Sequence, residues 1–329
     1  MAILVTGGAG YIGSHMVLAL VDAGEQVVVL DNLSTGFDWA LPASVPLIRG
    51  ETGDQAAVAS LIAAHQVSEI IHFAASIVVP DSVADPLGYY RNNTVNSRAL
   101  IETAVKAGVR SFIFSSTAAV YGNPARVPVD ESDATIPMSP YGWSKLMTEI
   151  MLRDAGAAHG LKHVILRYFN VAGADPLARS GQSTKGATHL IKVAVEAALG
   201  KRTKIDVFGT DYPTPDGTCI RDYIHVWDLV RAHSDALAYL RSKGPSVTLN
   251  CGYGRGFSVQ DVIATVKKVS GLDFKVELAP RRPGDPAQIV AASDRARAVL
   301  GWRSQLNDLE TIVAHALAWE RKLAARNRH

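Results

Sequence analysis

A tyrosine and a lysine four residues apart, in Tyr141-Gly-Trp-Ser-Lys145, form the pair of side chains best suited to acid–base chemistry. On a helix this spacing places both side chains on one face, where they can share a ligand. A phenol has an ordinary pKa of about 10, so its ionisation near neutral pH requires about 4 kcal/mol of stabilisation. The Lys145 ammonium can supply part of this through its charge. The same spacing also arises by chance on amphipathic helices, so other segments must decide between the two interpretations.

A glycine-rich turn follows an apolar run at the start of the chain. Residues 2–6 predict a strand, residues 14–23 predict a helix, and Gly7-Gly8-Ala9-Gly10-Tyr11-Ile12-Gly13 connects them. In this context glycines let the backbone approach a pyrophosphate, which the helix N-terminus binds. A second predicted strand, 26–30, is followed by Asp31, whose carboxylate can bind ribose hydroxyls and repel a 2′-phosphate. The pattern favours NAD over NADP; the alternative is an ordinary strand–helix turn with a surface aspartate.

Strands and helices alternate through the first half of the chain and predict the fold class. Later strands are predicted at 45–48, 69–73, 111–116 and 161–170, with helices at 54–65, 86–107 and 139–159. This alternation is typical of an α/β fold with a Rossmann-type, doubly wound parallel sheet. We expect residues 1–170 to form an NAD-binding domain and 171–329 mainly a smaller mixed α/β lobe for the substrate, with a segment at about 220–250 returning to the first domain.

Two of these predicted strands end where ligands bind in such sheets. Phe73-Ala74-Ala75 ends one, and Ser115-Ser116-Thr117 ends the other. The Thr117 hydroxyl can hydrogen-bond a substrate oxygen and share a proton with Tyr141, although a threonine in a turn is the alternative. His72, within a strand, is interpreted as a hydrogen-bonded core residue. Asn93 is either structural or holds a loop near the cofactor.

The second half of the chain is less regular, and its arginines suggest an anion site. Residues 175–184 predict a loop; helices are predicted at 188–199, 227–239, 259–269 and 306–322, and short strands at 204–208 and 247–250. Arg221 lies in one basic segment and Arg281-Arg282 in another. Arginine forks that converge on one cleft would clamp a diphosphate. As exposed surface residues, the same arginines would need no function.

Composition excludes several classes of function. The 329 residues include 33 Lys+Arg and 31 Asp+Glu, a formal charge of +2, so we expect neither a nucleic-acid nor a membrane partner. Cys219 and Cys251 are too few for a disulfide framework and lack the spacing of a metal site. The glycine at position 7 leaves no room for a signal segment, and no apolar run reaches the ~20 residues of a membrane span. We expect a cytoplasmic protein that uses no metal.

Longer segments identify a resemblance to a known family. They are Ser115-Ser-Thr-Ala-Ala-Val-Tyr-Gly122, Arg167-Tyr-Phe-Asn170, Asp211-Tyr-Pro-Thr214, Asp216-Gly-Thr218 and Arg221-Asp-Tyr223. Together with the glycine loop, Asp31 and the Tyr141/Lys145 pair, they resemble the extended short-chain dehydrogenase/reductase family. The loop and the pair occur in many members of that family. The longer segments resemble its UDP-glucose 4-epimerases over essentially the whole chain.

The resemblance implies an isomerase that interconverts UDP-sugars, foremost UDP-glucose and UDP-galactose, with tightly bound NAD regenerated in each turnover. Tyr141, as a phenolate, takes the proton of the sugar 4-hydroxyl while hydride passes to the nicotinamide, and the hydride returns to the opposite face of the sugar. Thr117 would bind the sugar oxygen and Lys145 the nicotinamide ribose. Family members commonly form homodimers, here through the helices at 86–107 and 139–159.

The resemblance assigns two sets of ligand-binding positions. For the cofactor they are Gly7, Gly10, Tyr11, Ile12, Gly13, Asp31, Asn32, Glu51, Thr52, Phe73, Ala74, Ala75, Asn93, Ser115, Tyr141, Lys145 and Tyr168. For the substrate they are Thr117, Asn170, His189, Leu190, Phe208, Arg221, Arg282 and Asp285. Phe208 is placed to stack on uracil, and the arginines to bind phosphate.

Several positions depart from the family pattern. Ile77 stands where a cofactor-binding lysine is common, which weakens the expected retention of NAD. Glu51-Thr52 stands where an aspartate often contacts adenine, and His189 replaces a common asparagine but keeps a hydrogen-bond donor. Ile289 stands at the position that limits sugar size in the family, so N-acetylhexosamines and pentoses stay open as alternatives to hexoses.

Related activities are disfavoured by individual residues. A nucleotide-sugar 4,6-dehydratase needs an acid and a base after the active-site threonine, where this chain has Ala118 and Ala119. A UDP-glucuronate decarboxylase usually has a glutamate in place of Ala119. A reductase with exchangeable NADPH needs a basic residue near Asp31-Asn32. A non-catalytic NAD-sensing protein typically loses the tyrosine or lysine that this chain retains.

Overall fold

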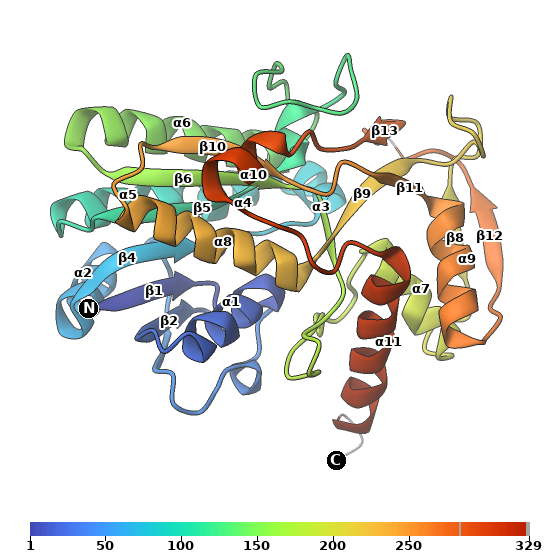
Figure 1. The fold of residues 1–329 in the computed structure, drawn as a ribbon, viewed down its shortest axis with the longest axis horizontal. Helices are drawn as coiled ribbons and strands as arrows, with labels where there is room; N and C mark the ends of the chain where they lie inside the picture. The colour runs from blue at the N-terminus through green and yellow to red at the C-terminus, as the bar shows by residue number, and fades with distance from the viewer. Residues whose placement is uncertain (283, 327–329) are drawn as a thin grey trace.

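A seven-stranded parallel sheet forms the centre of the computed structural model, which describes residues 1–282 and 284–326 (Figure 1). The strands lie in the order β10-β6-β5-β4-β1-β2-β3. Their bounds are β1 (Ala2–Thr6), β2 (Val27–Asp31), β3 (Leu47–Arg49), β4 (Val67–His72), β5 (Ser111–Thr117), β6 (Lys162–Tyr168) and β10 (Val247–Cys251). Helices flank this sheet, so the predicted Rossmann-type α/β class is confirmed.

Apolar side chains from the two faces of the sheet build two cores. Ile3 and Val5 of β1 pack in one core with α1 (Tyr11–Asp22) and α8 (Val226–Arg241). Leu4, between them, packs in the other core. The helices of that second core are α2 (Gln55–His65), α5 (Asn96–Lys106) and α6 (Pro140–His159). Because successive side chains in a strand point to opposite faces, strands covered on both sides are apolar at nearly every position.

The predicted helix at 86–107 is interrupted in the structure. It consists of α4 (Pro86–Tyr89), a π-helical segment η2 (Tyr90–Val95) and α5, and α3 (Val79–Ala84) precedes it. Two 3-10 turns, η1 (Asp38–Ala40) and η3 (Ala118–Tyr121), follow β2 and β5. Within the described ranges, no helix combines the length and the apolar character needed to cross a bilayer.

A smaller lobe holds two further sheets, at one end of the molecule (Figure 1). The four-stranded sheet contains β7 (Asn170–Ala172), β9 (Ile220–His225), β11 (Gly256–Ser258) and β13 (Gln288–Ile289), and the two-stranded sheet contains β8 (Ile205–Phe208) and β12 (Val276–Ala279). The helices of the lobe core are α7 (Leu190–Ala198), α9 (Val259–Ser270) and α11 (Leu309–Arg326). α10 (Asp294–Leu300) instead packs with α8 and β10.

The structure divides the predicted strand at 161–170 into two. β6 ends at Tyr168, and after Phe169 the chain leaves the large sheet, so that β7 pairs with β9. The strand predicted at 247–250 corresponds to β10, which pairs with β6. β9, β11, β12 and β13 were not predicted, because they are short or carry polar residues, so that no clear strand pattern is visible.

Five histidines are buried among the described residues, and they are His15, His72, His163, His225 and His233. His72 is confirmed as a hydrogen-bonded core residue, because its ring nitrogens lie 2.6 Å from Thr6 Oγ1 and 2.8 Å from Ser97 Oγ. Burial lowers the pKa to about 3 or 4 in His15, His72, His225 and His233. All four are therefore neutral in the folded protein near neutral pH.

We expect the free energy of unfolding to decrease as the pH falls from about 6.5 towards 4, by roughly 1.4 kcal/mol per histidine for each unit of pKa difference. The folded-state pKa values lie below the unfolded value, so this contribution is complete above the unfolded pKa and is lost on acidification. Urea unfolding at a series of pH values measures it. His72→Gln should show a shallower pH dependence, whereas the exposed His159→Gln should match the wild type. Equal dependence in all three proteins would contradict the explanation.

Candidate active site

The end of β5 and the start of α6 hold the predicted catalytic residues. Thr117 is the last residue of β5, and Tyr141 and Lys145 lie in the first two turns of α6. Ser139 caps this helix by accepting a hydrogen bond from a backbone N–H of its first turn. All three predicted side chains are buried, and the Lys145 amine donates to the Ser115 carbonyl oxygen at 2.9 Å. The structure therefore fastens the helix to the strand end at the site.

Burial controls the protonation of Tyr141 and Lys145. It raises the pKa of Tyr141 to about 12, against an opposing effect of a hydrogen bond with Thr117. It lowers the pKa of Lys145 to about 7, against the opposing effect of the Glu149 carboxylate. We expected the Lys145 charge to favour a phenolate, but in the structure desolvation outweighs the favourable contributions. These residues alone keep Tyr141 a phenol near neutral pH, so a phenolate requires a further positive charge.

The glycine loop between β1 and α1 packs too tightly for side chains at two positions. A Cβ atom at Gly7, whose φ is +69°, would lie 2.6 Å from the Ala74 backbone nitrogen, and one at Gly13 would lie 2.1 Å from the Gly7 carbonyl oxygen. α1 begins after Gly10 without a side-chain cap, so its first N–H groups are available to an anion. The loop thus fits a dinucleotide pyrophosphate through its backbone.

Asp31 ends β2, and its carboxylate binds the glycine loop. Oδ2 accepts from Ala9 N at 2.9 Å, and Oδ1 accepts from Leu33 N at 2.8 Å. A carboxylate has about four acceptor positions, so acceptor capacity remains for ribose hydroxyls. Beside it, Asn32 Nδ2 donates to Glu51 Oε1 at 3.0 Å. This region fits an adenosine ribose, and its negative charge opposes a 2′-phosphate.

Asn93 fastens the loop that follows β4. Its Nδ2 donates to the Ser76 carbonyl oxygen at 2.9 Å and to Ser144 Oγ at 3.0 Å, and its Oδ1 accepts from Ser76 N at 2.8 Å. Ser144 lies on α6, so one buried amide connects the loop to the helix of Tyr141 and Lys145. Of the two alternatives left open for Asn93, the geometry supports the holding of a loop.

Other predicted cofactor residues lie around these segments. Ser115 Oγ hydrogen-bonds the hydroxyl of Tyr168 on the neighbouring strand. The Tyr11 hydroxyl donates to the Gly173 carbonyl oxygen at 2.7 Å, which connects the glycine loop to the chain after β7. Of the remaining predicted cofactor residues, Ile12 lies in α1 and Thr52 follows β3. Phe73, Ala74 and Ala75 follow β4.

The predicted substrate residues of the lobe form two neighbouring groups. Arg221, on β9, has its Nη2 atom 3.6 Å from Asp285 Oδ1, and Ile289 lies opposite Arg221 in the β13–β9 pair. The Arg282 guanidinium lies 3.8 Å from the centroid of the Phe208 ring. Stacking of uracil on that face of Phe208 would therefore require Arg282 to move.

Three further predicted substrate residues, Asn170, His189 and Leu190, lie where β7 and α7 begin. A neighbouring arginine, Arg281, forms an ion pair of its own. Asn170 begins β7, and His189 immediately precedes α7, which begins at Leu190. Arg281, the neighbour of Arg282, donates from Nε to Asp211 Oδ1 at 2.7 Å. Arg281 is thus paired outside the group formed by Arg282 and Phe208.

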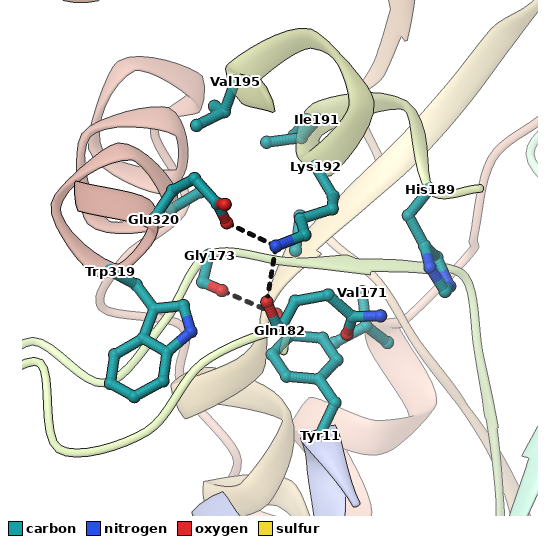
Figure 2. Close-up of a pocket in the computed structure, with 12 residues that line it drawn as sticks. Tyr11, Val171, Gly173, Gln182, His189, Ile191, Lys192, Val195, Trp319 and Glu320 are labelled. Atoms are coloured by element: carbon teal, nitrogen blue, oxygen red, sulfur yellow. Dashed lines mark hydrogen bonds and ion pairs between the residues drawn. The ribbon is translucent and has the colours of Figure 1, made fainter. Parts of the chain in front are cut away.

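A small cavity of about 20 Å³ lies between the glycine loop and the lobe helices (Figure 2). Tyr11 reaches it from α1, and His189 borders it beside α7. Lys192 donates to the Gln182 carbonyl oxygen at 2.9 Å and pairs with Glu320 across the cavity. The predicted catalytic residues do not line it. In the part of the chain that the structure describes, no group of three or more His, Cys, Asp or Glu residues is arranged to hold a metal.

Buried charged residues beside the site were missed. Glu149 follows Lys145 by four residues on α6 and pairs with Arg167 at 2.6 Å. Extending the tyrosine–lysine spacing by another four residues would have found it. Asp222, on β9, accepts from the backbone nitrogen of Tyr253, and burial raises the pKa of Asp222 to about 6. Asp222 was noted only as part of the segment Arg221-Asp-Tyr223, and because its partners come from separate segments, no local signal indicated its buried, hydrogen-bonded position.

Comparisons with known proteins agree with this geometry. The model of the NAD dependent epimerase/dehydratase family matches residues 3–252. The chain is 58% identical to the UDP-glucose 4-epimerase of Azospirillum brasilense, over 98% of this chain and 92% of that protein. The structure of UDP-glucose 4-epimerase from Brucella ovis in complex with NAD is 42% identical, with a TM-score of 0.94 and coverage of 96% and 97% of the two chains. That of UDP-glucose-4-epimerase from Stenotrophomonas maltophila with bound NAD and formylated UDP-arabinopyranose is 37% identical, with a TM-score of 0.95 and coverage of 99% of both.

The family match extends across all seven strands of the large sheet. It includes the glycine loop, Thr117, Tyr141 and Lys145, which the structure places at strand ends and at the start of α6. The full-length relatives add the lobe to this correspondence. The chain therefore belongs to the NAD dependent epimerase/dehydratase family.

Proposed function

We propose that this protein is an NAD-dependent UDP-sugar 4-epimerase that interconverts UDP-glucose and UDP-galactose. The observation that carries the proposal is the buried group of Thr117, Tyr141 and Lys145 at the end of β5. A phenol, a hydroxyl and an amine held together can exchange a proton with a sugar hydroxyl out of contact with water. The names of relatives that share up to 58% identity with the chain support the substrate class.

NAD, when bound, supplies a reversible acceptor for a hydride. The backbone of Gly7 to Gly13 and the start of α1 would hold its pyrophosphate, and Asp31 an adenosine ribose. Lys145 and the residues at the ends of β4 to β6 would surround the nicotinamide end. Ile77 is exposed and adds no charge, so retention depends on the loop and on Asp31.

Tyr141 transfers the proton in this proposal. The Thr117 hydroxyl, whose oxygen accepts from Ala119 N at 3.1 Å, acts to lower the pKa of the neighbouring phenol, and both side chains could reach a sugar hydroxyl placed between them. Because burial raises the pKa of Tyr141 to about 12, the phenolate forms only when a further cation stabilises it. Proton transfer is thereby restricted to the loaded site.

The lobe anchors the nucleotide in this proposal. Arg221 and Arg282 would bind the diphosphate, and Phe208 and Asp285 would contact the uridine. These residues lie in a different part of the chain from Thr117 and Tyr141. A firm hold on the nucleotide with few contacts to the sugar lets the oxidised sugar turn within the site. Ala118 and Ala119 provide neither acid nor base, so the keto sugar is not dehydrated.

The proposed assembly is a homodimer that pairs through an apolar face of α6 and neighbouring helices. Trp143, Met147 and Ile150 occupy one face of α6 and are 39%, 38% and 42% exposed. Leu87 on α4 and Val95 at the end of η2 are also exposed, and both elements contact α6. Apolar side chains gathered in this way are typical of a protein interface. The proposed location is the cytoplasm, which suits the two free buried cysteines.

Incubation of the purified protein with each UDP-sugar, without added cofactor, tests the activity. We expect UDP-glucose and UDP-galactose to interconvert, because retained NAD accepts and returns the hydride within one turnover. Chromatographic separation of the products measures this, and UDP-N-acetylglucosamine and UDP-xylose define the sugar range. If no sugar is converted by protein that contains NAD, the proposal fails.

Tyr141→Phe should lower kcat by roughly 10²-fold to 10⁴-fold, because the variant keeps the ring but has no exchangeable proton. Bound NAD, measured by absorbance after denaturation, should be unchanged. Undiminished turnover would remove the phenolate from the mechanism. Loss of NAD together with turnover would indicate that the hydroxyl has a structural role.

Met147→Glu combined with Ile150→Glu should convert the dimer to a monomer, because two charges would be buried in each half of the interface. Light scattering after size-exclusion chromatography measures the mass. Leu278→Glu, at an apolar position on β12 that is more exposed than Met147 and Ile150, serves as the control and should leave the mass unchanged. A dimer that persists in the double variant would refute the choice of surface.

A further inference from the structure

Helix α6 carries a third buried group in line with Tyr141 and Lys145. Glu149 follows Lys145 by four residues, as Lys145 follows Tyr141, so all three lie along one stripe of the helix. Glu149 is fully buried, with 0% of its surface exposed. A carboxylate is unstable in such a position unless it is paired and hydrogen-bonded.

Both carboxylate oxygens of Glu149 are paired. Oε1 accepts from Arg167 Nε at 3.0 Å and from the Ser116 hydroxyl, and Oε2 accepts from Arg167 Nη2 at 2.6 Å. The Arg167 Nη1 atom also donates to the Tyr121 hydroxyl at 3.0 Å. The carboxylate therefore has a fixed position between α6, β5 and β6.

Two successive residues of β5 are tied to this stripe of α6. The Ser115 carbonyl oxygen accepts from Lys145, and the Ser116 hydroxyl donates to Glu149. Thr117 is the next residue and ends the strand. The position of the Thr117 hydroxyl relative to Tyr141 thus depends on the contact that Lys145 makes two residues earlier and the contact that Glu149 makes one residue earlier.

Glu149 also supplies the opposing charge for Lys145. Burial lowers the pKa of Lys145 to about 7, and Glu149 acts in the opposite direction. The titratable groups that face this region from other elements include His72 on β4, which is neutral, Tyr121 on η3, and Arg167 and Tyr168 on β6. None of these can replace the carboxylate, because Arg167 is itself a cation and the other three are uncharged near neutral pH.

We propose that Glu149 is a positioning residue: its hydrogen bonds with Ser116 and Arg167 align the end of β5 with Tyr141, and its carboxylate, one helical turn from Lys145, favours the charged form of that amine. The inference rests on the epimerase activity proposed above. Without the carboxylate, the buried amine favours its neutral form. Tyr141 then loses the support of a nearby cation, and its phenol becomes harder to ionise.

Glu149→Gln tests the proposal, because the amide keeps the shape of the side chain and removes its charge. The measurement is the pH profile of kcat and KM with UDP-glucose. We expect kcat near neutral pH to fall at least about 10-fold and the rising limb of the profile to move about one unit towards higher pH. We expect KM to stay within about two-fold, because the lobe residues that hold the nucleotide are unchanged.

Other outcomes would overturn the inference. A rising limb that stays in place would show that Glu149 has only a structural role. A shift towards lower pH would show that its charge opposes the phenolate and that Lys145 stays charged without it. Bound NAD and the melting temperature establish that the variant is folded and loaded. A wild-type protein without turnover would instead refute the proposed activity.

Three further variants separate charge from position. Glu149→Asp keeps the negative charge but has a shorter side chain. It should therefore lower kcat and leave the rising limb of the pH profile in place. Glu320→Gln removes another buried carboxylate, the partner of Lys192, and should lower the melting temperature without moving the limb. If Glu149→Gln does not fold, Ser116→Ala tests the alignment alone, because every charge is kept. It should lower kcat several-fold, and an unchanged kcat would contradict the proposal.

Discussion

The burial of a phenol and an amine at one end of a sheet is the constraint on which this site depends. A medium of low polarity favours the neutral form of both, so the pKa of Tyr141 rises to about 12 and that of Lys145 falls to about 7. The fold must therefore provide fixed partners for them. It does so with the Ser115 carbonyl, the Thr117 hydroxyl and the Glu149 carboxylate.

The parallel sheet determines where these partners can be placed. Its strands are covered on both faces and are apolar, so polar groups gather where the strands end. Thr117 ends β5, Asp31 ends β2, and the glycine loop follows β1, all at the same edge. α6 then packs against β5 with its first turns at that edge, which brings Tyr141 and Lys145 to it.

The two halves of the site use different groups. The half proposed to hold the cofactor offers backbone N–H groups and glycines whose neighbours leave no room for a side chain, as at Gly13. The lobe relies on side chains, and its strands are held together by Asp222, which accepts backbone hydrogen bonds from residues after β10 and β13. A rigid cofactor loop and a lobe built from long side chains suit a site in which one ligand stays and the other is exchanged.

The sequence by itself determined the features that depend on neighbouring residues. These are the glycine loop with Asp31, the spacing of Tyr141 and Lys145, and the alternation that predicts the parallel sheet, because turns, helix faces and strand pleats are local properties. Only the tertiary structure decided that the chain leaves the large sheet after Phe169, and that β9 pairs with β7, β11 and β13 in the four-stranded sheet of the lobe. It also decided the placement of Arg282 over Phe208, the burial of Glu149 against Arg167, and the protonation of the site. The physical reason is that pairing between distant segments, and the loss of water around a charge, depend on how the whole chain packs.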